Sequence, residues 1–218
     1  MTEDRPRFTR KGRATRARII DVAARLMFER GVANTSIDEV RSTAGVGGSQ
    51  ISHYFSDKRD LTREVIAARR NDVVEFHTQP RLGALDSIEA LQAWADACVA
   101  DIDTVYRLGG CVYGSLAGEL IEADDEVRDD LAHGYDQWLG LFQTGLSAMR
   151  QRGDLRPEAD PRHLAASLVI AHQGGAMITH ATGEAEPLRV AVYAAVDYVR
   201  SFMADPKPRK SSSRKRKS

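Results

Sequence analysis

The stretch of residues 36–55 constrains the fold more than any other, because it is typical of two short helices that meet at a glycine turn. Ser36, with Glu39 three residues later, forms a capping-box pattern that begins the first helix. Gly45 can adopt the left-handed backbone that ends a helix, and Gly47 is a weak N-cap for the next one. The sequence therefore predicts a helix, a short turn and a second helix that begins near residue 48.

The second helix of this pair has a buried side and a polar side. Ile51 and Phe55 share one face at helical spacing. The other side presents short hydrogen-bonding groups without a carboxylate, and these are Gly48, Ser49, Gln50, Ser52 and His53. Such groups suit the edges of base pairs in the major groove of DNA. We therefore interpret residues 36–55 as a DNA-reading helix-turn-helix, with two packed helices of no DNA function as the alternative.

The residues around this motif carry a resemblance as well as a pattern. The matching positions are Ile19, Ile20, Ala23, Ala24, Leu26, Met27, Phe28, Gly31, Thr35, Ser36, Ile37, Val40, Ala44, Gly45, Val46, Ile51, Tyr54, Phe55, Lys58 and Leu61. With these residues, the chain from Arg16 to Leu61 resembles the N-terminal domain of the TetR family of bacterial transcriptional regulators. Gly47, Ser49 and Ser52 depart from the serine, glycine and tyrosine that are usual there, so an operator sequence cannot be carried over from relatives.

We predict that nine residues contact a double-stranded DNA operator. Lys58 follows the helix cap Asp57, so its ammonium and the helix N-terminus can bind one phosphate together. The predicted DNA contacts are Thr35, Ser36, Gly48, Ser49, Gln50, Ser52, His53, Tyr54 and Lys58.

The charges of the chain are segregated, although its net charge is zero. Residues 1–20 hold seven lysines and arginines against two acidic residues, and residues 205–218 hold seven against one. A polyanion is attracted to these two ends and repelled by the acidic body between them. We predict a flexible basic arm over residues 1–12, with a merely solvated tail as the alternative, and a disordered basic tail over residues 205–218.

Several classes of protein are excluded by composition. No apolar run approaches the length of about 18 residues that a membrane-spanning helix needs, so we expect a cytoplasmic protein without a membrane partner. Cys98 and Cys111 form no CxxC pair and have no matching histidine spacing. We therefore predict no disulfide scaffold, no metal site and no cofactor.

Helical periodicity continues to the end of the chain, and no segment is typical of a strand. Helices are expected at about residues 13–30, 58–76, 88–107, 113–122, 124–152, 163–181 and 187–203. The predicted fold class is all-α, with an N-terminal three-helix module over residues 13–75. A long helix joins this module to a C-terminal helical domain for ligand binding and dimerisation over residues 76–204.

Aromatic side chains on facing helices of the C-terminal domain are typical either of a plain core or of a cavity for an apolar ligand. The candidate cavity residues are Trp94, Cys98, Cys111, Tyr113, Tyr135, Trp138, Phe142 and His172. Cys111 follows Gly109 and Gly110 at the expected start of a helix, where the dipole can lower a thiol pKa. A thiol sensor of electrophiles or oxidants is therefore a second hypothesis, and an inert buried cysteine is the alternative.

The helix expected over residues 163–181 is apolar on nearly every side and must be buried on two faces. Two such helices from each of two chains can form a four-helix bundle, and the TetR resemblance implies the same homodimer. The predicted interface residues are Leu168, Gly174, Gly175, Val192, Val196 and Val199.

The leading functional hypothesis is a ligand-responsive dimeric repressor, released from a pseudo-palindromic operator by a small apolar molecule. An architectural protein that binds DNA without reading bases is the alternative. An enzyme in a helical bundle is a third class, for which the one acidic cluster is Glu119, Glu122, Asp124 and Asp125. This cluster lacks the Glu-x-x-His pattern of di-iron bundles and is typical of a helix cap and a solvated face, so no catalytic residue is predicted.

Overall fold

The computed structural model describes residues 8–122 and 124–205, and within them the chain is helical without a strand. The elements are α1 (Arg10–Arg30), α2 (Ile37–Thr43), α3 (Gly48–Tyr54), α4 (Lys58–His77), the 3-10 turn η1 (Pro80–Leu82), α5 (Ile88–Ala100), the π-helical turn η2 (Ile102–Tyr106), α6 (Arg107–Gly109), α7 (Gly114–Leu120), α8 (Asp125–Arg152), α9 (Pro161–Thr182) and α10 (Glu186–Arg200). The predicted all-α class is confirmed. No helix in the described ranges is long and apolar enough to cross a membrane.

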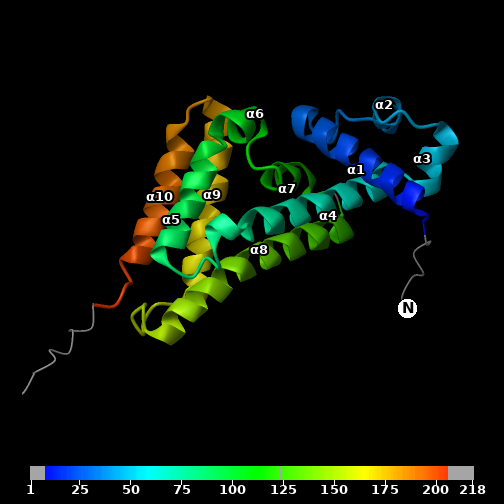
Figure 1. Ribbon diagram of the computed structural model, residues 1–218. Helices are drawn as coiled ribbons and strands as arrows, with labels where there is room; N and C mark the ends of the chain where they lie inside the picture. The colour runs from blue at the N-terminus through cyan, green and yellow to red at the C-terminus, as the bar shows by residue number, and fades with distance from the viewer. Residues whose placement is uncertain (1–7, 123, 206–218) are drawn as a thin grey trace, which may run out of the picture.

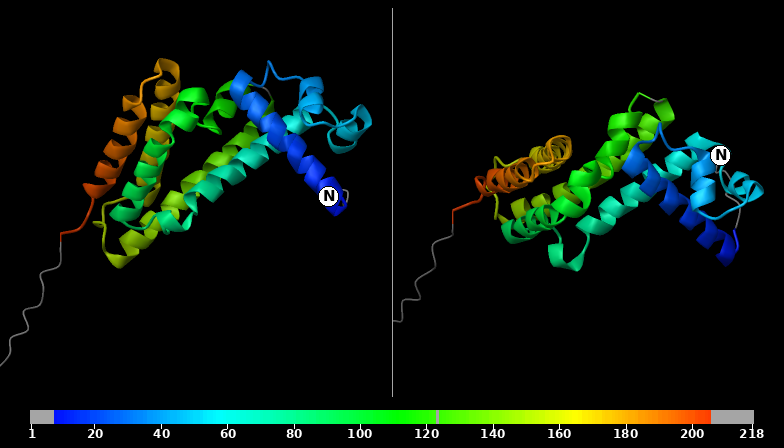
Figure 2. Two further views of the ribbon diagram at one scale, coloured as in Figure 1. Left: turned by 45° about the horizontal axis from the view of Figure 1, so that its top comes forward. Right: turned by 90° about the horizontal axis from the view of Figure 1, so that it is seen from above.

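Two long helices connect the two ends of the molecule. Figure 1 shows α1, α2 and α3 at one end, α5, α9 and α10 at the other, and α4 and α8 running between them. The turned views of Figure 2 also place α4 beside α8 and α9 beside α10. Arg59 and Arg63 of α4 form ion pairs with Asp124, the N-cap of α8, and with Asp130 of α8, at 2.8 and 2.6 Å. The two helices therefore run in the same direction. α4 therefore contacts helices of both ends of the fold, α1 at one end and α8 along its length.

The first helix begins earlier than expected. The Thr9 hydroxyl accepts a hydrogen bond from the Gly12 backbone N–H at 3.1 Å, which caps α1 and makes it helical from Arg10. The helix therefore takes up the last residues of the range 1–12 assigned to a flexible arm. The predicted arm otherwise falls on residues 1–7, and the predicted tail on residues 206–218, both outside the described residues.

The single helix expected over residues 88–107 is wrong, because the chain changes its helical winding after Ala100. The backbone N–H of Tyr106 reaches the carbonyl of Asp101, five residues back, at 3.4 Å. Turns of this wider kind occur mostly as short insertions and often at functional sites. Here η2 brings Tyr106 to α9, where its hydroxyl bonds to His172.

The helix α9 is buried on one face only within the chain. Leu168 and Ala176 are buried, whereas Ile170 and Met177 are 70% and 67% exposed. The expectation that a nearly all-apolar helix is buried on two faces is therefore not met inside one chain. A second apolar face of α9 remains on the outside.

Two glycines on α8 give a matched test of packing. A Cβ at Gly145 would lie 2.3 Å from the backbone oxygen of Leu85, whereas a Cβ at Gly140 would meet no atom within 4 Å. Gly145→Ala should therefore lower the free energy of unfolding by about 1–3 kcal/mol, the usual cost of overpacking. Gly140→Ala should raise it by about 0.5–1 kcal/mol, because alanine favours the helix. Urea unfolding of both variants measures the difference, and equal effects would contradict the packing described.

Candidate nucleic-acid interface and effector cavity

The turn between α2 and α3 depends on a glycine with a left-handed backbone, Gly45, and on a buried apolar residue, Val46. Gly45 has a φ of +62°, and the N–H of Val46 bonds back to the carbonyl of Arg41 at 3.1 Å, which closes the end of α2. Val46 is buried, so the turn is anchored to the core. Gly47 then precedes α3, and its N–H donates to the side-chain oxygen of Gln50 at 3.2 Å. α3 begins at Gly48, in agreement with the sequence analysis.

The capping box expected at Ser36 is only half formed. The Ser36 hydroxyl accepts from the N–H of Glu39 at 3.2 Å. The Glu39 carboxylate does not return to Ser36, because it pairs with Arg30 at the end of α1. This ion pair fixes α2 against α1 instead.

The outer face of α3 is open to solvent. Ile51 and Phe55 are 4% and 3% exposed and belong to the core, while the opposite side of α3 is exposed along its length. The exposed residues are Gly48, Ser49, Gln50, Ser52 and His53. None carries a carboxylate, so this face presents hydrogen-bonding groups without repelling a phosphate backbone.

The other predicted DNA contacts differ in exposure. Thr35 is 1% exposed, and its hydroxyl donates to the carbonyl of Gly31 at 2.9 Å, so its inclusion as a side-chain contact is a correction. Ser36 is exposed at the start of α2, and Tyr54 is half-buried at the end of α3. The ammonium of Lys58 lies 3.4 Å from the carbonyl of Ala33, beside the N-terminus of α4.

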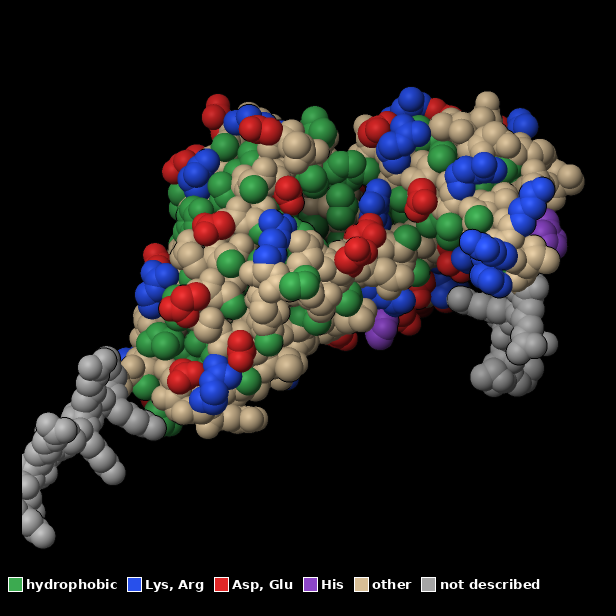
Figure 3. Space-filling view, in the orientation of Figure 1, with side chains coloured by type: hydrophobic (Ala, Val, Ile, Leu, Met, Phe, Trp, Pro, Cys, Tyr) green, Lys and Arg blue, Asp and Glu red, His purple; other side chains and the backbone are tan. Residues whose placement is uncertain are grey.

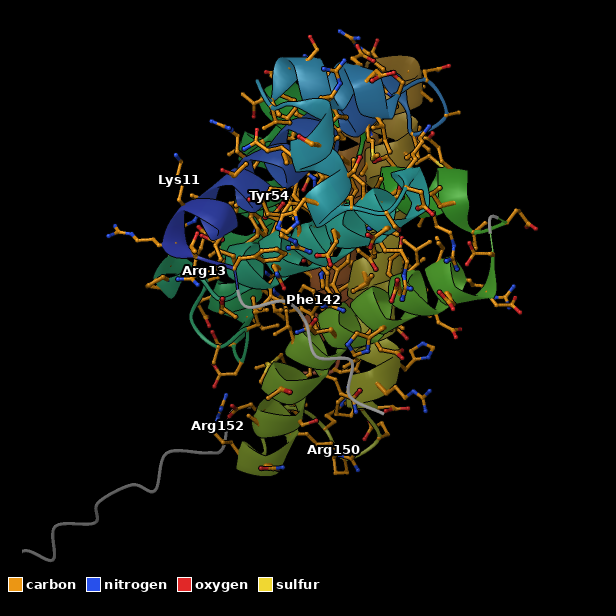
Figure 4. All side chains as sticks on the ribbon, turned by 90° about the vertical axis from the view of Figure 1, so that its right-hand side faces the viewer. Lys11, Arg13, Tyr54, Phe142, Arg150 and Arg152 are labelled. Atoms are coloured by element: carbon orange, nitrogen blue, oxygen red, sulfur yellow. The ribbon has the colours of Figure 1, made fainter. Side chains whose placement is uncertain are left out.

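The start of α1 lies against α3. The ring of Phe8 packs on His53 and Tyr54, with centroids 5.7 and 5.1 Å apart. Figure 4, which looks onto this end of the molecule, shows Lys11 and Arg13 at the first turn of α1 near Tyr54. Lysine and arginine side chains also spread over the N-terminal helices in the space-filling view of Figure 3. Positive charge and the polar face of α3 thus share one end of the fold.

A cavity of about 260 Å³ lies where α4, η2, α8 and α9 meet. Three of the predicted residues line it, namely Cys111, Trp138 and His172. The rest of its lining consists of Arg69, Asp72, Val73, Phe76, His77, Asp101, Val105, Tyr106 and Val112. Five of these belong to the second half of α4, so the cavity is bounded by the same helix that carries the N-terminal module.

The other predicted cavity residues are core residues or lie beside the cavity. Trp94, Cys98, Tyr113 and Phe142 are at most 1% exposed, and none of them lines the cavity, so their assignment to a pocket is corrected. Tyr135 is half-buried, and its ring lies parallel to that of Trp138 with centroids 6.3 Å apart. The helical spacing of these aromatic residues therefore reflects packing rather than ligand contact.

His77 joins three helices through hydrogen bonds. Its Nε2 accepts from the indole N–H of Trp94 at 3.1 Å and from that of Trp138 at 2.9 Å. Its Nδ1 lies 2.7 Å from the carbonyl of Val73 and must donate, because a carbonyl can only accept. The ring is therefore neutral in this arrangement, and its burial lowers the pKa of His77 to about 4.

His172 of α9 is one of the residues that line the cavity. Its Nε2 is 2.8 Å from the hydroxyl of Tyr106, and burial lowers the pKa of His172 to about 3. The rings of Trp138 and Tyr106 pack around it, with centroids 5.1 and 5.3 Å away. The surroundings of His172 are therefore aromatic, and its imidazole is neutral near neutral pH.

The environment of Cys111 contradicts an activated thiol. Its side chain is buried, and the amide of Gln173 donates to the sulfur at 3.3 Å. Burial is the largest influence on this group and raises the pKa of Cys111, so the thiol stays protonated near neutral pH. The backbone N–H groups of Gly114 and Tyr113, at the start of α7, do lower the pKa of Cys111, but burial outweighs them, so the expected net lowering is wrong.

The exposed apolar surface of α9 and α10, here called the α9–α10 face, is formed by Ile170, Gly174, Met177, Ile178, Pro187, Val190 and Tyr198. A shallow groove of about 530 Å³ runs along it, lined almost entirely by apolar atoms. The predicted interface residues Leu168, Val192, Val196 and Val199 lie on the opposite, fully buried sides of the two helices. They belong to the core of the single chain and are corrected as interface residues.

The two adjacent glycines of α9 have different surroundings. A Cβ at Gly175 would lie 2.8 Å from the Cα of Leu188, so Gly175 permits the close approach of α10 in the same chain. Gly174 has open space and lines the groove of the α9–α10 face. Of the predicted interface residues, Gly174 is therefore the one on an accessible surface.

Comparison with known families gives two matches that together cover most of the described helices. The model described as "Bacterial regulatory proteins, tetR family" matches residues 19–65. The model described as "Tetracyclin repressor-like, C-terminal domain" matches residues 87–195, half of the chain. The chain belongs to the TetR family.

Individual relatives of this TetR-family chain are distant in sequence. The HTH-type transcriptional repressor DhaR of Mycobacterium sp. (strain GP1) is 22% identical over 174 residues, which are 79% of this chain and 86% of the relative. The HTH-type transcriptional repressor KstR2 of Rhodococcus jostii (strain RHA1) is 23% identical over 153 residues, 68% of this chain and 74% of the relative. These proteins are regulators of transcription, and the prediction of a DNA-binding regulator rather than an enzyme is confirmed at the level of the family.

Solved structures share the fold. A TetR transcriptional regulator from Chloroflexus aurantiacus superposes with a TM-score of 0.77 at 24% identity, over 89% of this chain and 98% of that one. At this identity the likeness concerns the arrangement of helices. The two ends of the fold in Figure 1 are the parts that the two family models match, residues 19–65 and residues 87–195.

Most of the residues that line the cavity of this TetR-family chain are not among those predicted from the sequence. Arg69, Asp72, Val73, Phe76 and His77 recur at intervals of three and four along α4, which places them on one helical face. That spacing is visible in the sequence. This face of α4 mixes charged, aromatic and aliphatic residues, as an ordinary partly solvated helix does. It becomes a cavity wall only because α8 and α9 pack near it.

The acidic cluster considered for an enzyme has structural roles. Asp124 caps α8 and pairs with Arg59, and Glu119 accepts from the N–H of Val32 at 2.7 Å. Among the described residues, no group of three or more His, Cys, Asp or Glu side chains is placed to hold a metal ion. Glu119 instead joins α7 to the loop that follows α1.

Proposed function

We propose that the chain is a homodimeric repressor that reads a pseudo-palindromic operator with α3 and is released by a small molecule in the 260 Å³ cavity. The observation that carries the proposal is the position of α4, which begins beside α3 and ends in the wall of the cavity. A ligand in the cavity therefore contacts the element that orients the DNA-binding helices. The names of DhaR and KstR2, both transcriptional repressors, support the sign of the regulation.

Dimerisation through the α9–α10 face supplies the second reading helix. Val190 is 55% exposed and Ile170 is 70% exposed, and both lie on one apolar surface. Exposed apolar patches of this kind mark sites of protein–protein contact. A second copy related by a two-fold axis covers this face with the same face of its own and makes a four-helix bundle. Two α3 helices then meet two half-sites that lie about 34–36 Å apart along the DNA.

The switch acts through the spacing of these two helices. A ligand that fits one dimer geometry better than the other lowers operator affinity by its difference in binding free energy between the two states. Ion pairs from Arg59 and Arg63 to α8, together with the bond from Glu119 to Val32, tie the DNA-binding domain to the C-terminal domain. Movement of α4 at the cavity is thereby passed to α3. A coupling of about 1–3 kcal/mol is typical of such systems.

Base readout is tested by comparing two variants. Gln50→Ala should relax the preference for one base pair in each half-site, since a bidentate contact to adenine discriminates by about 1–3 kcal/mol. Lys58→Ala should weaken binding to all sequences alike, because a phosphate carries no sequence information. Selection of bound DNA from a random pool, with each variant, measures both effects. If the selected DNA motif were the same for Gln50→Ala as for the parent chain, Gln50 would not be a base contact and the proposed base-reading face of α3 would be wrong.

The same experiment separates readout from helix stability. Gln50 also accepts from the N–H of Gly47, so its removal weakens the start of α3. A loosened helix lowers affinity for every sequence and leaves the motif intact, whereas a lost base contact changes the motif.

A further inference from the structure

The end of α1 is held by residues 107–120, the segment that contains α6 and α7 and is here called the clasp (Figure 1). The ring of Phe28 lies against Gly109, where an added Cβ would come within 2.4 Å of a ring carbon. The carboxylate of Glu119 accepts a hydrogen bond from the N–H of Val32 at 2.7 Å. The end of α1 lies in the N-terminal family match and the clasp in the C-terminal one, so these contacts join the two ends of the fold.

The clasp also forms part of the cavity wall. Cys111 and Val112 line the cavity, and both lie between the two contacts that hold α1. On its other side the clasp is fastened to the C-terminal helices. The hydroxyl of Tyr113 donates to the carbonyl of Leu131 at 2.8 Å, and the amide of Gln173 donates to the sulfur of Cys111 at 3.3 Å. A molecule that fills the cavity is therefore in contact with the chain between the two points that hold α1.

α1 can pass a movement at the clasp on to α3. Its 21 residues form a helix about 32 Å long. Just before its start, the ring of Phe8 packs on Tyr54 of α3 with centroids 5.1 Å apart. Arg16 of the second turn lies over the ring of Phe55 at 5.4 Å. The clasp therefore holds one end of a helix whose other end packs on α3.

The ion pairs between α4 and α8 are a weaker support for the same domain. The side chains of Arg59 and Arg63 are 49% and 38% exposed, and water and salt screen ion pairs that are this open. The packing of Phe28 on Gly109 and the hydrogen bond of Glu119 supply a second support at the end of α1.

We propose that the clasp sets the orientation of the DNA-binding helices and that a molecule in the cavity acts on DNA by displacing the clasp. This inference rests on the proposed ligand-responsive function and names the element that carries its signal. While Gly109 and Glu119 hold the end of α1, the two α3 helices of a dimer keep the spacing of the half-sites. A ligand against residues 111–112 loosens both contacts, the spacing is lost and operator affinity falls.

The first measurement is amide hydrogen exchange of the purified full chain without DNA or ligand. Glu119→Ala removes the acceptor of the Val32 N–H, so exchange of that amide should become at least about tenfold faster. Glu122→Ala is the matched control, because Glu122 is exposed and forms no hydrogen bond or ion pair among the described residues. In this control the rate should stay within about twofold of that of the parent chain. An unchanged rate in Glu119→Ala overturns the proposal.

The second measurement compares the affinity for DNA with one half-site and with two. Gly109→Ala displaces the Phe28 ring, so the affinity for two correctly spaced half-sites should fall at least about fivefold. The affinity for a single half-site should not change, because one α3 needs no fixed spacing. Gly118→Ala is the control within the clasp, since a Cβ there meets no atom within 4 Å, and it should bind both DNAs like the parent chain.

Phe28→Ala covers the case in which Gly109→Ala does not fold. It empties the same contact from the side of α1 and should show the same loss, confined to two half-sites. In a folded variant, an unchanged affinity for two half-sites overturns the proposal, and so does an equal loss on both DNAs.

The third measurement tests the link between the clasp and the cavity. Coupling between two sites is reciprocal, so operator binding should change the cavity side of the clasp. Exchange of the amides of residues 111–114 should change at least about threefold when the parent chain binds its selected operator, and less than about 1.5-fold in Glu119→Ala. No change in the parent chain, or a change that persists in Glu119→Ala, overturns the proposal. A parent chain that selects no operator defeats the proposed function instead, and exchange at Val32 still decides whether the clasp holds α1.

Discussion

Val190→Asp should leave the chain monomeric and weaken operator binding at least about a hundredfold. Val190 lies in the groove of the α9–α10 face and is 55% exposed in the single chain. In a two-fold dimer each copy contributes this residue to the same apolar contact, so the substitution buries two carboxylates without partners. An unpaired charge at an interface costs about 2–5 kcal/mol, and every 1.4 kcal/mol is a tenfold change in affinity.

The control for this variant is Ile121→Asp. Ile121 is also an exposed large hydrophobic residue, at 52%, and it follows α7, outside the α9–α10 face. Analytical ultracentrifugation should find Ile121→Asp dimeric and Val190→Asp monomeric at the same concentration. A dimeric Val190→Asp that binds the operator normally would show that the chain dimerises elsewhere, and monomers of both variants would point to a general loss of fold.

His77→Leu should lower the free energy of unfolding by about 2–6 kcal/mol at neutral pH. The substitution removes the acceptor of two buried indole N–H groups, from Trp94 and Trp138, and each unpaired donor costs about 1–3 kcal/mol. His133→Leu is the control, since His133 is exposed on α8 and its change should stay within about 0.5 kcal/mol. Chemical unfolding of both variants measures the difference. A small effect at His77 would mean that the indoles find other acceptors.

The same histidine makes stability depend on pH. Its pKa is about 4 in the folded chain and 6.5 as an ordinary histidine, so between these values the unfolded chain binds more protons. Stability from His77 is fully present above pH 6.5 and falls, by about 3 kcal/mol in all, as the pH drops towards 4. His172, with a pKa of about 3, adds a second loss of the same sign. The free energy of unfolding, measured by chemical denaturation at pH values from 7 to 5, should fall steeply. In His77→Leu it should fall about half as steeply, because only His172 then contributes.

The DNA-binding domain could be predicted closely because its signals are local. Gly45 ends α2, Asp57 caps α4, and Ile51 and Phe55 mark the inner face of α3, all within a few residues of the feature they determine. Thr35 is not the DNA contact that the sequence suggests, because its hydroxyl donates to the carbonyl of Gly31. The sequence alone does not show whether such a hydroxyl bonds inside the chain or faces solvent.

The cavity and the dimer face could be predicted only in outline because they depend on distant contacts. Trp94 and Trp138 follow the same helical pattern, yet only Trp138 reaches the cavity, since the π-turn η2 and the approach of α9 decide which ring is covered. Gly174 and Gly175 are equivalent in the sequence. Their roles separate only when α10 packs on Gly175 and leaves Gly174 outside. Apolar residues on two sides of α9 predict two covered faces and do not say which helix covers each one; within the chain, one of the two faces stays exposed.

The most direct test of the account is footprinting of the full chain on DNA selected from a random pool, in the presence of excess competitor DNA. We expect one discrete protected site with two inverted half-sites whose centres lie one helical turn of DNA apart, or a multiple of it. Protection should survive competitor because α3 reads bases as well as phosphates. Uniform protection that competitor removes would contradict the account and identify a protein that binds DNA through its charge alone.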